Sequence, residues 1–100
     1  MTDAQYSVYI LRCGDGSYYT GIALDVERRI GEHESGRRGS KYLKGRGPLT
    51  LVYSKAVGDR SAASRIEYRI KQLRRSDKRA LIDGRSTLPE LTTDQDSAAG

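Results

Sequence analysis

The sequence predicts an α+β fold in which two strands, a helix, a third strand and two further helices follow one another. Side chains alternate over residues 7–12 and 18–22, which is typical of strands, and the turn-forming residues 14–16 separate the two runs. Residues 49–57 are dense in β-formers, whereas the intervening and following segments repeat apolar residues at helical spacing. We therefore expect a small three-stranded antiparallel sheet flanked by helices.

The length of the first turn decides which side chains of the predicted hairpin share a face. If three residues loop out, Leu11 pairs with Tyr19. Tyr9 then pairs with Gly21, and both tyrosines lie on one face of the hairpin. An even loop would send them to opposite faces, because side chains alternate along a strand. Only the odd register makes the two tyrosines parts of one site.

The first predicted helix begins after Asp25, a good N-cap, and its apolar stripe includes His33. Arg29 lies beside this stripe, four residues before His33. Arg28 lies over Glu32 on the outer face of the same helix. This spacing predicts that Arg29 is the arginine that points inward.

The second half of the chain supplies the third strand, at residues 49–57, and a second helix that Asp59 or Ser61 can cap. Glu67 lies at the edge of the apolar stripe of this helix. One interpretation of Glu67 is an ion pair with Lys71 one turn later, worth about 0.3–0.5 kcal/mol. A carboxylate beside an apolar stripe favours the other interpretation, a metal ligand.

A third, short helix is predicted to start at Ser76 or Asp77 and to stop at Gly84. Residues 86–100 are polar, acidic and without aromatic side chains, so we expect a frayed or disordered tail. The predicted domain organisation is one domain over residues 1–85, followed by this tail.

Charge and composition narrow the class of partner. Residues 1–85 carry 18 Lys and Arg against 10 Asp and Glu, a net charge of +8, whereas residues 86–100 carry −3. A positive field of this size favours nucleic acid as the partner, with a merely solubilising surface as the alternative. The single cysteine, Cys13, fits a cytoplasmic location, and we expect no membrane association and see no sign of a protein partner.

Residues 36–48 have four glycines and five Lys or Arg, which predicts a mobile basic loop. Loops of this composition often follow phosphates, and Tyr42 can stack on an unpaired base. The alternatives are a solvated surface for the cations and a core anchor for the tyrosine. The predicted nucleic-acid-binding residues are Arg37, Arg38, Lys41, Tyr42, Lys44 and Arg46.

Five side chains converge in this arrangement and form the candidate catalytic set: Tyr9, Tyr19, Arg29, His33 and Glu67. Phosphodiester hydrolysis needs a group that takes a proton from water and positive charge that neutralises the transition state. A guanidinium and a divalent cation held by a carboxylate supply that charge. Taken singly, each tyrosine is better explained as a sheet aromatic, and the spacing to Arg29 and Glu67 is what favours the catalytic interpretation.

Two strings on the hairpin, Ser7-Val8-Tyr9 and Tyr19-Thr20-Gly21, resemble the signature of the GIY-YIG nuclease superfamily in loose form. In that superfamily an Arg follows the glycine of the second string by eight residues and a His or Tyr follows it by twelve. Those positions hold Arg29 and His33 here, and Glu67 lies on a later helix. The resemblance covers residues 7 to about 82. Size and residues 38–42 look like the small stand-alone YhbQ-like branch.

The resemblance implies an endonuclease that cuts DNA with one Mg²⁺ or Mn²⁺ ion held by Glu67. Arg29 would contact the scissile phosphate, Tyr9 or His33 would assist proton removal, and Gly21 belongs to the structural motif. Single-stranded or structured DNA and a role in DNA repair or processing are the expected context. Many members carry an Asn after the Glu helix, and this sequence contains no Asn. The alternative function is a noncatalytic module that binds DNA or RNA and retains the fold.

Overall fold

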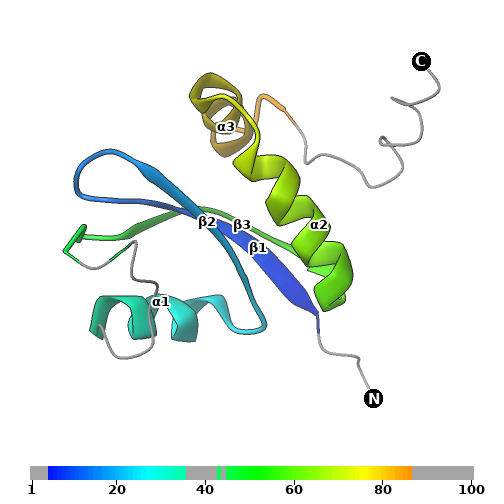
Figure 1. Ribbon diagram of the computed structural model, residues 1–100, viewed down its shortest axis with the longest axis horizontal. Coiled ribbons are helices and arrows are strands. Elements are labelled where there is room, and N and C mark those ends of the chain that lie inside the picture. Colours follow the sequence, from blue (N-terminus) through cyan, green and yellow to red (C-terminus); the bar gives the residue numbers. More distant parts are fainter. Residues whose placement is uncertain (1–4, 36–42, 44, 87–100) are drawn as a thin grey trace.

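The computed structural model describes residues 5–35, 43 and 45–86. It confirms the predicted α+β class and the order of the elements (Figure 1). The elements are β1 (Tyr6–Arg12), β2 (Tyr18–Ala23), α1 (Val26–Ser35), β3 (Thr50–Gly58), α2 (Arg60–Lys71) and α3 (Arg75–Ile82). In the described part of the chain, no helix is long and apolar enough to cross a membrane.

The three strands form one antiparallel sheet in the order β2-β1-β3, with β1 in the centre. Tyr9 pairs with Gly21, and Leu11 pairs with Tyr19, which confirms the three-residue loop. Gly16 has a φ of +87°, a left-handed conformation that a loop of this length requires at one position. Both tyrosines therefore lie on the same face of the sheet.

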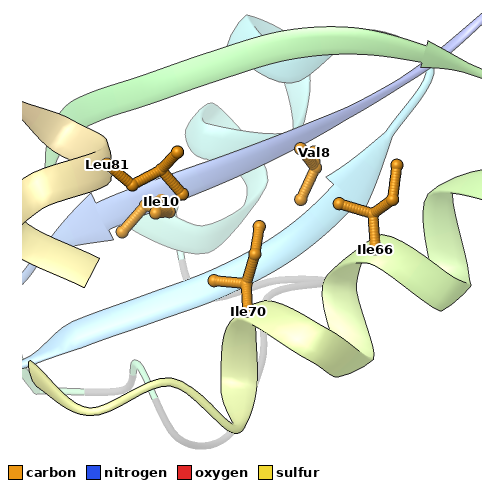
Figure 2. Close-up of a cluster of buried hydrophobic side chains, with 5 residues drawn as sticks. All are labelled: Val8, Ile10, Ile66, Ile70 and Leu81. Atoms are coloured by element: carbon orange, nitrogen blue, oxygen red, sulfur yellow. The ribbon is translucent and has the colours of Figure 1, made fainter. Parts of the chain in front are cut away.

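One face of the sheet packs against α2 and α3, and the buried side chains between them are aliphatic (Figure 2). The buried members of this aliphatic cluster are Val8, Ile10, Ile66, Ile70 and Leu81. Burying each such side chain contributes about 1.5–3 kcal/mol. This face therefore supplies much of the hydrophobic stabilisation of the domain.

The opposite face of the sheet carries the alternate side chains of β1 and packs against α1. Val26 and Ile30 of α1 lie against this face together with Leu49. The buried members of this second group, the tyrosine-face cluster, are Tyr9, Leu11, Cys13, Ala23 and Leu43. Leu43 thus anchors its segment to this face, because its side chain is buried here.

The first two helices begin at the predicted caps. The Asp25 carboxylate accepts a hydrogen bond from the Arg28 amide at 3.1 Å, and α1 follows. The Asp59 carboxylate accepts from the Ala62 amide at 2.8 Å, which selects Asp59 over Ser61 as the cap of α2. Each carboxylate satisfies an amide that the helix itself leaves without a partner.

The predicted start of α3 at Ser76 or Asp77 is wrong by one or two residues, because α3 begins at Arg75. The Arg74 carbonyl accepts hydrogen bonds from the Asp77 and Lys78 amides, both at 3.0 Å, so the first turn forms earlier. Arg74 makes no side-chain capping bond. The sequence therefore offers no capping residue to mark the true start.

The tip of the hairpin is tied to the segment before β3. The Gly14 amide donates to the Arg46 carbonyl at 2.7 Å, and the Arg46 guanidinium forms an ion pair with Asp15. Gly14 also packs so closely on the Gly47 backbone that any Cβ at position 14 would clash with it. Glycine is therefore required at position 14 for this contact.

A second tie joins the same tip to α3. The Arg75 guanidinium donates to the Gly16 carbonyl at 2.7 Å. It also lies over the Tyr18 ring, 4.4 Å from the ring centroid, in a cation-π contact. The hairpin that carries both candidate tyrosines is thus held from two sides.

Candidate active site

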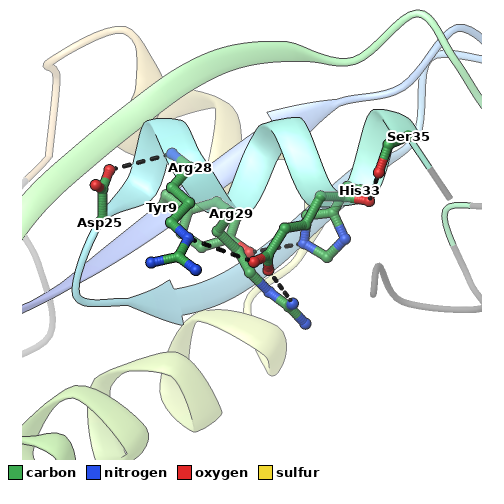
Figure 3. Close-up of polar contacts among 7 residues, drawn as sticks. Tyr9, Asp25, Arg28, Arg29, His33 and Ser35 are labelled. Carbon is green, nitrogen blue, oxygen red and sulfur yellow. Dashed lines mark hydrogen bonds and ion pairs between the residues drawn. The ribbon is translucent and has the colours of Figure 1, made fainter. Parts of the chain in front are cut away.

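The Tyr9 side chain lies in the centre of the sheet and meets His33, the single histidine of the sequence. The Tyr9 hydroxyl and His33 Nε2 lie 3.0 Å apart and share a hydrogen bond (Figure 3). Both residues are buried, with exposed fractions of 1% for Tyr9 and 5% for His33. The bond satisfies two polar groups that would be costly to bury alone.

Tyr19 and Gly21 fix the position of this pair. The Tyr19 ring meets His33 edge to face, with centroids 5.5 Å apart, and lies 6.4 Å from the Tyr9 ring. A Cβ placed on Gly21 would lie 2.6 Å from the Tyr9 hydroxyl oxygen, closer than nonbonded atoms tolerate. The absence of a side chain at position 21 therefore makes room for the Tyr9 hydroxyl.

Arg29 is the inward arginine of α1, as the helical spacing predicts. Its side chain is 33% exposed, against 75% for Arg28. Glu32, which the sequence assigns to Arg28 alone, contacts both arginines: Arg29 Nη1 lies 2.8 Å from Glu32 Oε1, and Arg28 Nε lies 3.6 Å from Glu32 Oε2. One carboxylate thus holds two guanidinium groups beside each other.

The electrostatics of Tyr9 reflect its buried position. Burial, with a smaller contribution from the neighbouring Tyr19, raises the pKa of the Tyr9 hydroxyl to about 12. The Arg29 charge and its hydrogen bonding to the hydroxyl act in the opposite direction. Tyr9 therefore keeps its proton at neutral pH unless a partner accepts it.

His33 is the partner that can accept this proton. Burial lowers the pKa of the His33 imidazole below its ordinary value, and the Arg29 charge lowers it further, while Glu32 acts in the opposite direction. Since a neutral imidazole has a free lone pair on one ring nitrogen, His33 can accept a proton at neutral pH.

Glu67 lies on α2, within electrostatic range of the Tyr9 hydroxyl, and its charge raises the pKa of that hydroxyl. The Glu67 side chain is 22% exposed, and its Oε2 lies 3.3 Å from Lys71 Nζ. The ion pair that the sequence offers as one interpretation is therefore present, and the role of Glu67 as a metal ligand stays a prediction.

Most of the chain matches one known protein family. Residues 5–80 match the model of the GIY-YIG catalytic domain. The chain belongs to the GIY-YIG family. The matched range includes every member of the candidate catalytic set, from Tyr9 to Glu67. The general functional class indicated by this domain is nuclease.

Relatives and solved structures of the GIY-YIG family agree with this assignment. UPF0213 protein YhbQ of Escherichia coli K12 is 50% identical over 84 residues, 84% of this chain and 83% of that protein. A UPF0213 protein of Halobacterium salinarum is 50% identical over 77 residues, 77% of this chain and 99% of its own length. The YhbQ-like branch predicted from the sequence is thereby confirmed.

Two solution NMR structures share the GIY-YIG fold seen here. A UPF0213 protein from Bacillus halodurans is 48% identical, with a TM-score of 0.51 over 79% of this chain and 83% of that one. A protein from E. faecalis is 35% identical, with a TM-score of 0.57 over 83% and 86%. The predicted arrangement of strands and helices is confirmed by both.

The donor set of this GIY-YIG site fits some metals and excludes others. Among the described residues, no three His, Cys, Asp or Glu side chains gather as a ligand group. Such a site does not suit zinc, which takes three or four protein ligands. Mg²⁺ is typically held by one or two carboxylates, with waters and substrate phosphates completing its shell, and Glu67 matches that mode.

Most of the predicted nucleic-acid-binding loop lies outside the residues that the structure describes. Five of its members lie outside the described residues: Arg37, Arg38, Lys41, Tyr42 and Lys44. Arg46 is described, and its side chain pairs with Asp15 at the hairpin tip. Arg46 thus has a structural contact in addition to any role in binding, which remains a prediction.

Glu32 is the member of the site that the sequence reasoning did not recognise. Its link to Arg29 follows from i,i+3 spacing, a signal that was present in the sequence. The i,i+4 spacing assigned Glu32 to Arg28, and so Glu32 was not paired with Arg29. Glu32 connects the outer arginine to the inward one and so extends the site beyond the candidate set.

Proposed function

We propose that this GIY-YIG protein is a divalent-metal-dependent endonuclease that hydrolyses phosphodiester bonds in DNA. The observation that carries the proposal is the buried hydrogen bond between Tyr9 and His33, 3.0 Å long, beside the Arg29 guanidinium. A buried proton donor and acceptor next to a fixed cation form an arrangement suited to activating water near a phosphate.

The proton path follows from the two pKa shifts. Tyr9 holds its proton too tightly to act as a base alone, because its pKa is about 12. It can take a proton from water if it passes its own proton to His33, which is neutral at neutral pH. This requires the His33 tautomer with hydrogen on Nδ1, so that Nε2 accepts from the Tyr9 hydroxyl.

The phosphate chemistry uses the charged residues on either side of Tyr9. The water oxygen forms a bond to phosphorus while the bond to one ester oxygen breaks, and that oxygen leaves to take up a proton from solvent. Arg29 faces the phosphate and balances the negative charge that develops on its oxygens. A divalent cation held by Glu67 would supply further neutralisation at the phosphate and the leaving oxygen.

Single-stranded or structured DNA is the substrate form we propose, for a protein of the cytoplasm that acts in DNA repair or processing. The net charge of +8 over residues 1–85 suits a polyanion. One small domain has little surface with which to read a long duplex sequence. A substrate recognised by its shape or its unpaired bases fits this size better.

The test is cleavage of end-labelled single-stranded, duplex and branched DNA, and of RNA, with Mg²⁺ or Mn²⁺. We expect Glu67→Gln and Arg29→Ala each to lower kcat/KM by about 100-fold or more. Glu27→Gln, an exposed acid in the first turn of α1, and Arg65→Ala, an exposed base on α2, are the matched controls and should cut normally.

The noncatalytic alternative is favoured by one contact, the ion pair between Glu67 and Lys71. If Glu67 serves only that pair, Glu67→Gln leaves nucleic-acid binding unchanged and no metal-dependent cleavage occurs in any variant. Binding that weakens steeply with salt, without turnover in the wild-type protein, would establish the binding module in place of the nuclease.

A further inference from the structure

A groove of about 320 Å³ lies at the end of β2 and along α1, and Arg29, which also acts on the Tyr9 hydroxyl, lines it. Its apolar part is lined by Tyr6, Ile22 and Leu24, and its charged part by Arg28 and Arg29. We infer that this groove binds one unpaired nucleotide of the DNA, next to the phosphate that is cut. This inference rests on the proposed function, and it adds to it the recognition of an unpaired base.

The charged part of the groove is continuous with the candidate active site. Arg29 lines the groove, and its charge and hydrogen bonding also lower the pKa of the Tyr9 hydroxyl. A phosphate bound by Arg29 would therefore lie between the groove and the candidate active site. Arg28 lines the same groove with a 75% exposed side chain (Figure 3). Since Glu32 contacts both guanidinium groups, it holds two phosphate-binding cations on one wall.

A ligand in the apolar part of the groove would account for the exposure of Leu24. Leu24 is 55% exposed, and it lies in the groove beside Ile22 and the Tyr6 ring. A nucleobase placed there would cover Leu24 and would gain from contact with an aromatic ring. A lining with both apolar side chains and two arginines matches the two parts of a nucleotide, a base and its phosphate.

The size of the groove matches one nucleotide. Its volume is at the low end of the range for small-molecule sites, about 300–1,000 Å³. The Asp25 and Glu32 carboxylates also line it, and they oppose a run of several phosphates. An unpaired base can reach its apolar part more readily than a base that is stacked and paired in a duplex, so duplex DNA should bind here less well.

The first experiment removes the base from the substrate. A single-stranded oligonucleotide carries one abasic residue, which is moved step by step past the cut position, and cleavage is measured at each step. We expect cleavage by the wild type to fall about 5-fold or more at one position beside the cut, the size of a lost stacking contact. Leu24→Ala should flatten this dependence. Leu51→Ala, which changes another exposed leucine outside the groove, should retain it.

The second experiment tests the charged wall by binding without divalent metal. Fluorescence anisotropy of labelled single-stranded DNA should show weaker binding by Arg28→Gln and a salt slope smaller by about one. Arg85→Gln is the matched control, because Arg85 is a similarly exposed arginine that pairs with an acid outside the groove. All four variants change exposed side chains, so circular dichroism should show the wild-type fold.

The outcomes separate the two proposals. Cleavage that ignores the abasic position, or that is equal in Leu24→Ala and Leu51→Ala, overturns the nucleotide groove and leaves the nuclease assignment intact. Faster cutting of duplex than of single strands overturns the groove as well. A wild-type protein that neither binds nor cuts any nucleic acid overturns the proposed function and the groove with it.

Discussion

The two faces of the central strand β1 differ in kind. Val8 and Ile10 point to a cluster of aliphatic side chains supplied by α2 and α3. Tyr9 and Leu11, which alternate with them, point to the face covered by α1, where a tyrosine and a histidine are buried with a hydrogen bond between them. The same seven-residue strand therefore contributes to a uniform hydrophobic core and to a polar site.

Because side chains alternate along a strand, β1 directs its stabilising aliphatic side chains to one face and its polar pair to the other. The fully buried side chains of the aliphatic face carry no titrating group. On the tyrosine face, the Tyr9 hydroxyl and the His33 imidazole are themselves buried among apolar neighbours. Substitutions on the two faces should therefore have different signatures.

The largest expected effect is on the tyrosine face. Tyr9→Phe removes the hydroxyl and leaves the ring, so kcat/KM for DNA cleavage should fall about 10²- to 10⁴-fold. The free energy of unfolding should fall by about 1–3 kcal/mol, because the buried His33 Nε2 loses this hydrogen bond. Tyr18→Phe, next to Tyr19 but packed against the aliphatic cluster, is the control and should cut at the wild-type rate. Equal rates for all three proteins would contradict the proton path.

The second largest effect is on the aliphatic face. Ile70→Ala should lower the free energy of unfolding by about 2–5 kcal/mol, because it leaves a cavity in a fully buried position. The rate per folded molecule should stay unchanged. Leu11→Ala, equally buried on the other face, should cost similar stability and also reduce the rate, since it lies beside Tyr9. Urea unfolding measures the free energy of unfolding, and active-site titration gives the cleavage rate per folded molecule. An equal loss of rate in Ile70→Ala and Leu11→Ala would show that the two faces of β1 do not differ in their effect on cleavage.

A smaller effect concerns pH. Because the pKa of His33 is lowered from 6.5 in the folded protein, the unfolded chain takes up its proton first as the pH falls. Stability should therefore be complete above about pH 6.5 and decline below it, and cleavage should fall with an apparent pKa under 6.5. Denaturant unfolding at pH 5 to 8 measures this dependence. His33→Gln should remove the part of the decline in the free energy of unfolding with falling pH that is due to His33. An unchanged slope in this variant would show that His33 does not titrate as inferred.

The smallest effect concerns the ties at the hairpin tip. Arg75→Ala removes the hydrogen bond to the Gly16 carbonyl and the contact with the Tyr18 ring, and should lower the free energy of unfolding by about 1–2 kcal/mol. Arg79→Ala, another exposed arginine of α3, should have less effect. Differential scanning calorimetry distinguishes the two, and identical midpoints would mean that the tie contributes nothing to folding.

Much of this arrangement could be predicted because the signals are local. Strand alternation and the three-residue loop place Tyr9 opposite Gly21, and helix periodicity distinguishes Arg29 from Arg28. The contacts at the hairpin tip could not be predicted, since they join Asp15 to Arg46 across 31 positions with no repeating pattern. The groove could not be predicted either, because, although most of its lining comes from residues 22–32, the lining joins Tyr6 of β1 to the end of β2 and to α1.

Gly21 has a practical consequence. A single methyl group there would push the Tyr9 hydroxyl away from His33, because no space exists between the β2 backbone and that oxygen. Gly21→Ala would change no charge and remove no hydrogen-bonding side chain, so the proposed binding of phosphate by the two arginines of α1 and of the metal ion by Glu67 should be retained. Such a variant should capture DNA without cutting it, which makes it a tool for isolating the substrate from a mixture of nucleic acids.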